Sequence, residues 1–296
     1  MKKILFASTA LILSAGVASA NNNISFSGDA RMGVVYNSAN VAPVSKTQFS
    51  ARARMTIRMQ RTTDSGLTVG ATFRVDQGGA AIGNTSMSGG NVFISGDFGR
   101  LTMGDIAGAA QAATGNLPNI GFSELRQGVQ WLGNAAGNRT AMRYEYSFDG
   151  FTVYLSSDQL ISGAGNTQVM GIGAKYSFDG FTVGIGHEQG KLAGVSDRHT
   201  IISGEAAIDM VTLKAVYGDR RTGGVKSKQY GVSASANIDA VNVTAYYMRR
   251  FDTSRNFGLG ASYNLGGGAH LRGAVNRTRL GGVSTNTADF GVTMSF

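Results

Sequence analysis

The sequence predicts an all-β fold, a single antiparallel transmembrane β-barrel of sixteen strands. Segments of about ten residues alternate between apolar and polar side chains, which is the period of a β-strand. The octet YSFDGFTV occurs twice, at Tyr146–Val153 and at Tyr176–Val183, which indicates a repeated structural unit. The 296 residues include 43 Gly but only 2 Pro and no Cys, a composition that argues against disorder and excludes disulfide or thiol chemistry.

Residues 1–20 have the pattern of a signal peptide. Lys2 and Lys3 are followed by a short apolar run and by the small residues ASA at 18–20. The alternative is a membrane anchor, but the apolar run is shorter than the ~18 residues that a spanning helix needs. We therefore expect an exported protein whose barrel is formed by residues 21–296.

The repeated octet predicts a β-hairpin with a tight turn. Asp149-Gly150 lies between two phenylalanines, and Asp-Gly between alternating apolar segments is a strong signal for a two-residue turn. Asp179, Asp209 and Asp239 follow at steps of 30 residues. One unit is therefore two strands, one tight turn and one longer loop.

Applied along the chain, this unit predicts all sixteen strands. Their expected ranges are 23–36, 47–61, 67–76, 91–96, 100–105, 139–148, 151–158, 167–178, 181–189, 198–208, 211–219, 227–238, 241–250, 255–265, 268–279 and 287–296. Longer connections, on the side opposite the tight turns, are expected at 41–47, 77–90, 157–167, 190–197, 220–227, 251–255 and 280–287.

The chemistry of the two strand faces indicates a membrane environment. One face of nearly every strand is apolar, and the other carries Ser, Thr, Gly, Asn and isolated charges. Aromatic residues gather at the strand ends, as membrane girdles require: Tyr146, Phe148, Phe151, Tyr176, Phe178, Phe181, Tyr263 and Phe296. The alternative, a soluble β-sandwich with one wet face, does not explain the export signal or these outward aromatics. Sixteen strands enclose an aqueous channel, with short periplasmic turns and longer extracellular loops.

The segment 106–138 interrupts the regular alternation of strands and short connections. It contains Trp131 and Pro118, and a connection of this length is uncommon unless it is functional. It folds into the lumen as a constriction or covers a neighbouring subunit, and the small residues of AGAAQAA favour the first.

Several stretches carry a resemblance to a known family. They are SGDARMGVVYN, RTTDSGLTVGATFR, VFISGDFGRLTMGD, NLPNIGFSEL, FGLGASYNLGGGA and ADFGVTMSF. Over essentially all of 21–296 the chain resembles the general diffusion porins of Gram-negative outer membranes, in particular those of purple non-sulfur and related α-proteobacteria. The resemblance implies a homotrimer in the cell outer membrane, an assembly signal that ends at Phe296, and a third extracellular loop, 106–138, folded into the lumen. It implies passive diffusion of small hydrophilic solutes, with lipid and lipopolysaccharide around the barrel.

The resemblance also implies a constriction in which basic residues of the wall face acidic residues of the third loop. The wall residues that match are Arg31, Arg52, Arg54, Arg58 and Arg74. The loop departs from the pattern, because it offers only Glu124, with Asp105 at its start, and Arg126 adds positive charge.

Strand parity places more basic than acidic residues in the lumen, which predicts a preference for anions. The basic residues are Arg31, Arg52, Arg54, Arg58, Arg74, Arg100, Arg143, Lys175, Lys214, Arg250 and Arg272. The acidic residues are Asp29, Asp76, Glu145, Asp158, Glu188, Glu205 and Asp289.

Other functions have weaker support in the residues. His187, His199 and His270 lie on separate strands without ligand spacing, so we expect no metal, no cofactor and no catalytic site. Glycine-rich stretches lack the helix that a phosphate cradle needs, and we interpret strand glycines as thinning the wall. The net charge of +9 suggests nucleic acid, but the arginines fall on the lumen face.

The alternative function is a substrate-selective porin for phosphate, an organic anion or a sugar. A sugar path needs inward aromatics, of which only Tyr154 and Tyr246 are evident. An outer-membrane barrel enzyme or adhesin is less favoured, because no lipid-facing Ser/His pair or large external loop is visible.

Overall fold

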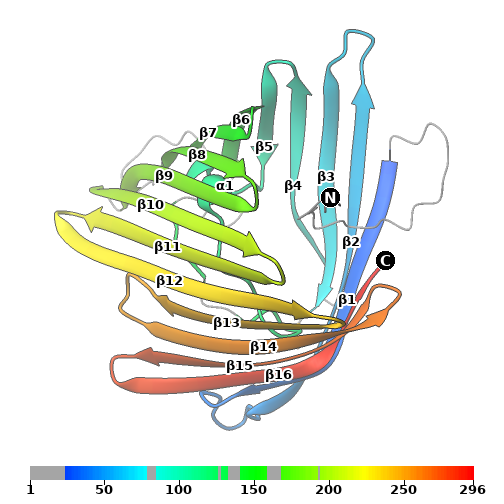
Figure 1. Cartoon of the computed structure of the whole chain (residues 1–296), viewed down its shortest axis with the longest axis vertical. Helices are drawn as coiled ribbons and strands as arrows, with labels where there is room; N and C mark the ends of the chain where they lie inside the picture. The colour runs from blue at the N-terminus through cyan, green and yellow to red at the C-terminus, as the bar shows by residue number, and fades with distance from the viewer. Residues whose placement is uncertain (1–23, 79–84, 126–127, 133–140, 159–167, 193) are drawn as a thin grey trace.

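The computed structural model describes residues 24–78, 85–125, 128–132, 141–158, 168–192 and 194–296. The expected signal peptide at 1–20 lies outside them. Sixteen antiparallel strands form one closed barrel in which each strand pairs with its neighbours in sequence and β1 pairs with β16 (Figure 1). The predicted fold class and strand count are confirmed.

The strand bounds follow from the alternating pattern. They are β1 Ile24–Asn37, β2 Thr47–Thr62, β3 Thr68–Gly78, β4 Thr85–Gly96, β5 Gly99–Gly104, β6 Ala141–Phe148, β7 Phe151–Ser157, β8 Met170–Phe178, β9 Phe181–Leu192, β10 Val195–Ile208, β11 Val211–Thr222, β12 Val225–Ile238, β13 Val241–Arg249, β14 Arg255–Gly266, β15 Ala269–Leu280 and β16 Val283–Ser295.

The Asp-Gly hairpins have the predicted turn geometry. Asp149 and Gly150 have φ values of 44° and 81°, and Asp179 and Gly180 have 41° and 81°. Positive φ at both central residues matches the right-handed twist of the flanking strands, which explains the Asp-Gly choice.

The prediction of longer loops is wrong for three ranges: 190–197, 220–227 and 280–287. Strands β11 and β12 pair as far as Thr222 and Val225, and β15 and β16 as far as Leu280 and Val283, so only two glycines join each pair. Strands β9 and β10 likewise pair as far as Leu192 and Val195. Charged residues near these ends suggested loops, but they belong to long hairpins. In 77–90, β3 runs to Gly78 and β4 starts at Thr85, earlier than the expected 91.

The outer face near the tight turns carries a row of aromatic rings. Phe151 stacks on Tyr176 with ring centroids 4.1 Å apart, and Phe178 lies 5.5 Å from Phe181. The repeated octet thus places its aromatics side by side on neighbouring hairpins, where they form the predicted girdle.

The barrel closes between the first and last strands. Gly28 N donates to Phe296 O at 3.1 Å, and Phe296 N donates to Gly28 O at 2.9 Å. The Phe296 side chain is exposed on the outer face.

Deleting Phe296 is expected to lower the assembled fraction several-fold while leaving the conductance of the remaining channels unchanged. The deletion removes two backbone hydrogen bonds of the seam, each contributing about 1 kcal/mol, and an outward aromatic, but nothing in the lumen. Heat-modifiable gel mobility measures assembly, and Phe296→Leu, which keeps the backbone, is the control. Equal assembly of the deletion and the full chain contradicts this prediction.

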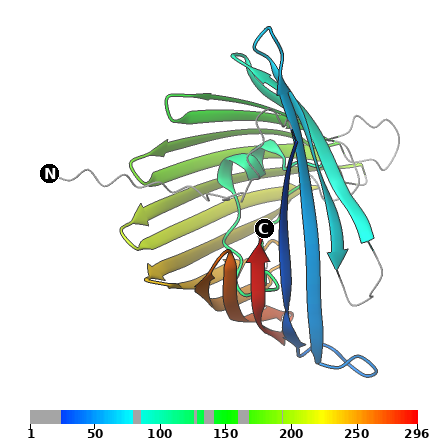
Figure 2. The same cartoon turned by 90° about the vertical axis from the view of Figure 1, so that its right-hand side faces the viewer.

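Among the described residues there is one short helix, α1 (Ala109–Thr114), which lies within the barrel (Figure 2). Within the described ranges, no helix is both long enough and apolar enough to cross a membrane.

Candidate functional site

The segment after β5 turns inward, and α1 packs on glycines of the inner wall. A Cβ at Gly173 would lie 2.5 Å from Ala109 O, and one at Gly186 would lie 2.5 Å from Ala110 Cα. These distances are too short for any side chain. The interpretation of strand glycines as thinning the wall is therefore incomplete, because glycines of β8 and β9 make room for the helix.

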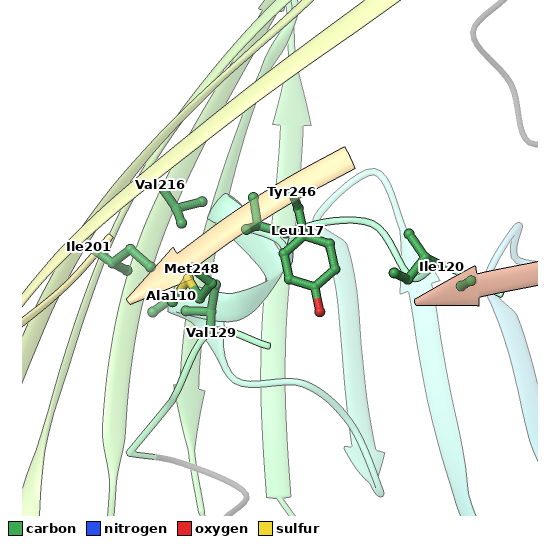
Figure 3. Close-up of a cluster of buried hydrophobic side chains, with 9 residues drawn as sticks. Ala110, Leu117, Ile120, Val129, Ile201, Val216, Tyr246 and Met248 are labelled. Carbon is green, nitrogen blue, oxygen red and sulfur yellow. The ribbon is translucent and has the colours of Figure 1, made fainter. Parts of the chain in front are cut away.

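Together with α1, the described residues that follow it in the third loop form an apolar core with the inner wall (Figure 3). Its nine buried residues are 0–7% exposed: Ala110, Leu117, Ile120, Val129, Ile201, Val216, Tyr246, Met248 and Ala274. The loop supplies the first four, and β10, β11, β13 and β15 supply the others. This packing against the inner wall helps to hold the described part of the loop in the lumen.

The tip of the loop is seated on the closing seam. Phe122, 1% exposed, lies over the facing glycines Gly33 and Gly291 of β1 and β16, where a Cβ at either would lie 2.9 Å from its ring. Ser123 N donates to Asp289 Oδ2 at 2.8 Å, and Ser123 Oγ donates to the same oxygen.

The return limb of the loop is held by buried polar side chains. Leu132 N donates to Glu188 Oε2 at 2.9 Å, and His199 Nδ1 lies 3.2 Å from the same oxygen. Gln229 accepts from Gln130 N at 2.9 Å and donates to Gln130 O at 3.0 Å. The Glu188, His199 and Gln229 side chains are 0–2% exposed, so their hydrogen bonds fix the limb in a water-poor site.

Next to the seated tip, three arginines of the wall surround one glutamate of the loop. Arg52 donates two hydrogen bonds to Glu124, both at 3.2 Å. Arg31 and Arg54 lie 3.5 Å and 3.7 Å from the same carboxylate. Asp29 pairs with Arg54 at 2.8 Å and with Arg52 at 3.5 Å. We call these five residues the constriction cluster.

The pairing of β1 with β2 creates the wall side of this cluster. Asp29 stands opposite Arg54, and Arg31 stands opposite Arg52. Residues two apart in a strand share a face, so all four point into the lumen. Asp29 was predicted as a lumen acid but not as part of the constriction. Its position two residues before Arg31 is the sequence signal that could have placed it there.

The remaining predicted wall residues lie outside the cluster. Arg74 pairs with Asp76 two residues later on β3, with Nη2 to Oδ2 at 2.8 Å. Arg58 lies on the same face as Arg54, nearer the tight turns, and forms no salt bridge with any described residue.

On the loop, Glu124 reaches the wall arginines and Asp105 does not. Asp105 begins the loop, where its backbone N–H donates to Gly90 O at 2.9 Å, and it forms no salt bridge in the described ranges. Arg126 lies outside the described residues. Glu124 has a φ of 63°, a conformation that is rare for residues other than glycine, and the arginines hold it there.

Of the three histidines, His199 is one of the buried polar side chains beside the return limb of the loop, where its Nδ1 lies 3.2 Å from Glu188 Oε2. In the part of the chain that the structure describes, no group of three or more His, Cys, Asp or Glu residues is arranged to hold a metal ion.

The charges of the cluster set the ionisation of Glu124. Partial burial disfavours its carboxylate, but the Arg52 hydrogen bonds and the charges of Arg52, Arg31 and Arg54 outweigh burial and lower the pKa of Glu124.

We expect the ion selectivity that depends on Glu124 to persist as the pH falls through the ordinary glutamate range. Below its lowered pKa the carboxylate is neutral, the arginines lose a counter-charge, and anion preference rises. Reversal potentials in a KCl gradient, measured from pH 7 downward, follow this change. In Glu124→Gln the anion preference is already raised at pH 7, and the step assigned to Glu124 is absent. The assignment is contradicted by a step at or above the ordinary glutamate pKa that the wild type shows and Glu124→Gln lacks.

Comparisons with known proteins agree with this architecture. A family model described as Gram-negative porin matches residues 7–282. The porin of Rhodobacter capsulatus is 37% identical over 141 residues, which cover 45% of this chain and 44% of that protein. The match thus spans less than half the length of this curated relative.

Among solved structures, a porin refined at 1.8 Å superposes with a TM-score of 0.76 at 29% identity, over 92% of this chain and 100% of that one. A variant of Rh. blastica porin gives a TM-score of 0.77 at 21% identity with the same coverage, a likeness of fold alone.

Proposed function

Because the chain belongs to the Gram-negative porin family, we propose that it forms a water-filled channel for passive diffusion of small hydrophilic solutes across the outer membrane. The observation that carries the proposal is a charged constriction, built where the third loop meets the inner wall of a closed barrel. The described residues of this site contribute packing and charge, which supports a channel.

The proposed location is the outer membrane, reached after removal of a signal peptide at 1–20. The tight turns face the periplasm and the third loop enters from outside. The exposed aromatic girdle beside the Asp-Gly turns supports this placement, because such rings gather at membrane interfaces.

The proposed assembly is a heat-resistant homotrimer. The support is the family, together with small outward residues on the first three strands: Gly28, Ala30, Ala51, Ala53 and Ala71. Small residues let two barrel walls approach closely. Light scattering in mild detergent tests the stoichiometry, and a monomer with full channel activity contradicts the proposal.

We also propose a modest preference for anions. In the constriction cluster, three arginines face two carboxylates. Elsewhere in the lumen, Glu145 pairs with Arg143 and Glu205 with Lys214, while Lys175 and Arg272 form no salt bridge with described residues. A narrow passage focuses such an excess of positive charge.

A second candidate function is selective transport of phosphate or an organic anion. A lumen pocket of about 580 Å³ is lined by Lys175, Lys214 and several hydroxyl side chains, and also by the carboxylates of Asp179 and Glu205. Because Glu205 pairs with Lys214, Lys175 is the cation of this pocket that forms no salt bridge with a described residue. A sugar path has less support, because Tyr154 and Tyr246 are both buried, each 6% exposed, among residues of the loop.

Planar-bilayer recording of the refolded full chain tests these proposals. Passive diffusion predicts stepwise channels whose conductance rises in proportion to bulk salt. Block by millimolar phosphate, with saturation, instead favours the second candidate. No channel steps from protein that migrates as a folded barrel contradicts both.

A further inference from the structure

A second pocket lies in the lumen, on the tight-turn side of the seated loop tip. It has a volume of about 290 Å³ and lies between the tip residues 119–121 and the inner wall formed by β12–β15. Ile120 covers the pocket from the loop, because Gly260 of β14 has no side chain: a Cβ there would lie 2.7 Å from Ile120 Cβ. The seated tip is thus one wall of the pocket.

Four polar residues form a row across the wall of this pocket, each directly opposite the next on paired strands. They are Asn237 of β12, Asn242 of β13, Ser262 of β14 and Arg272 of β15. Directly opposite residues of a sheet have Cβ atoms about 4.5–5.5 Å apart. One small ligand can therefore contact two or three neighbours of the row at once.

The two ends of the row differ in how far the chain itself satisfies their hydrogen bonds. At one end, Asn242 Nδ2 donates to Asn237 Oδ1 at 2.8 Å, and Thr244 Oγ1 donates to Asn242 Oδ1 at 3.1 Å. At the other end, neither Ser262 nor Arg272 forms a side-chain hydrogen bond or a salt bridge with a described residue. Arg272 Nε is buried without a partner, which costs free energy that a bound acceptor recovers.

The charges around Arg272 favour an anion at this end of the pocket. His270 lies two residues away on the same face of β15 and also lines the pocket. On the neighbouring strand β16, the lumen-facing carboxylate is Asp289, which accepts from Ser123 and forms no salt bridge with Arg272. A guanidinium group without a counter-charge binds a carboxylate by two parallel hydrogen bonds.

The opposite end of the pocket carries a negative charge. Asp239, in the turn between β12 and β13, lines the pocket and is exposed. It repels a second carboxylate on a ligand whose first carboxylate is bound by Arg272. Hydroxyl groups both donate and accept, so they fit the amide of Asn242 and the hydroxyl of Ser262 between these two charges. The pocket therefore favours one negative charge together with several hydroxyl groups.

We propose that this pocket is a binding site for small hydroxy acids that carry a single carboxylate. Arg272 binds the carboxylate, Ser262 and Asn242 bind hydroxyl groups, and Asp239 excludes dianions. The proposal rests on the proposed channel, through which such an anion reaches the lumen, and adds a saturable site to passive diffusion. This site is separate from the pocket that Lys175 and Lys214 line.

The test uses the full chain refolded in mild detergent and titrated with D-gluconate, which has one carboxylate and several hydroxyl groups. Calorimetric titration is expected to show saturable binding. R272Q removes the charge and is expected to weaken binding by about tenfold or more, and S262A by about threefold. R272K keeps the charge but not the two parallel donors, and is expected to recover part of the loss.

The matched control is R100Q, because Arg100 is a lumen cation of β5 that does not line this pocket. It is expected to bind gluconate as the wild type does. Heat-modifiable gel mobility shows which variants are folded. Three further ligands separate the parts of the proposal: glucose lacks the charge, acetate lacks the hydroxyl groups, and glucarate adds a second carboxylate. Each is expected to bind the wild type more weakly than gluconate does.

The proposal is overturned if R272Q binds gluconate normally, if R100Q weakens binding as much as R272Q does, or if acetate or glucarate binds as tightly as gluconate. Binding that is lost in K175Q and kept in R272Q assigns the anion to the other lumen pocket and also overturns it. Channel conductance in KCl, recorded on the same preparations without gluconate, tests the proposed function separately. Normal channel steps without gluconate binding reject this site alone.

Discussion

Replacing Phe122 with alanine is expected to unseat the tip of the third loop and to raise both single-channel conductance and current noise. The ring is almost fully buried against Gly33 and Gly291. Removing a buried phenylalanine ring costs about 3–5 kcal/mol, which shifts the equilibrium between seated and unseated tip by about a hundredfold or more. The hydrogen bonds from Ser123 to Asp289 are then left to hold the tip, and Glu124 no longer stays among the arginines.

Two controls separate unseating of the tip from general damage to the barrel. Phe290→Ala removes a ring of the same size from the outer face of β16, where Phe290 is 60% exposed, and is expected to leave conductance unchanged. Asp289→Asn weakens the hydrogen bonds from Ser123 that also hold the tip. It is expected to change conductance in the same direction as Phe122→Ala. If Phe122→Ala forms channels with the conductance and the current noise of the wild type, the Phe122 ring does not hold the loop.

Neutralising Arg31, Arg52 and Arg54 together is expected to reverse the ion selectivity in dilute salt. The cluster changes from three positive and two negative charges to two negative charges, because Asp29 and Glu124 remain. Arg74 is not included, because its charge is balanced by Asp76.

Reversal potentials under a KCl gradient measure this change. The effect is expected to be clear at ~0.01 M and small at ~1 M salt, since the Debye length falls from ~30 Å to ~3 Å. The control R198Q/R221Q/K226Q makes the same change of net charge on the outer face and is expected to leave the potential unchanged. If the lumen triple variant still prefers chloride at low salt, selectivity is set elsewhere in the lumen.

The strand count and the tight turns could be predicted because they depend on local information. Alternation of side chains and the Asp-Gly turns repeat along the chain, and each hairpin pairs neighbours in sequence. The wrongly predicted loops lie where polar and charged residues are compatible with either a loop or a lumen-facing strand. Asp197 and Arg220 look like loop residues, yet they form an ion pair on the lumen face of a long hairpin.

The wall residues that the third loop contacts could not be predicted, because these contacts join residues far apart in sequence. Ser123 and Asp289 are separated by 166 positions, and Leu132 and Glu188 by 56. Parity assigned Asp289 and Glu188 to the lumen but did not say which lumen residues the loop would meet. Glu124 was identified because it is the one acidic residue between 106 and 138.

The seam between β1 and β16 has a consequence for the order of folding. All other strand pairs join consecutive strands, whereas Gly28 and Phe296 must meet from opposite ends of the chain. Closing a loop of roughly 270 residues costs about 5 kcal/mol of chain entropy. A chain that ends before its last strand keeps two unpaired edges, which have no partners in hydrocarbon. The barrel is therefore expected to be completed only once the last strand is present. Ring closure is expected to be the slow step of refolding into lipid.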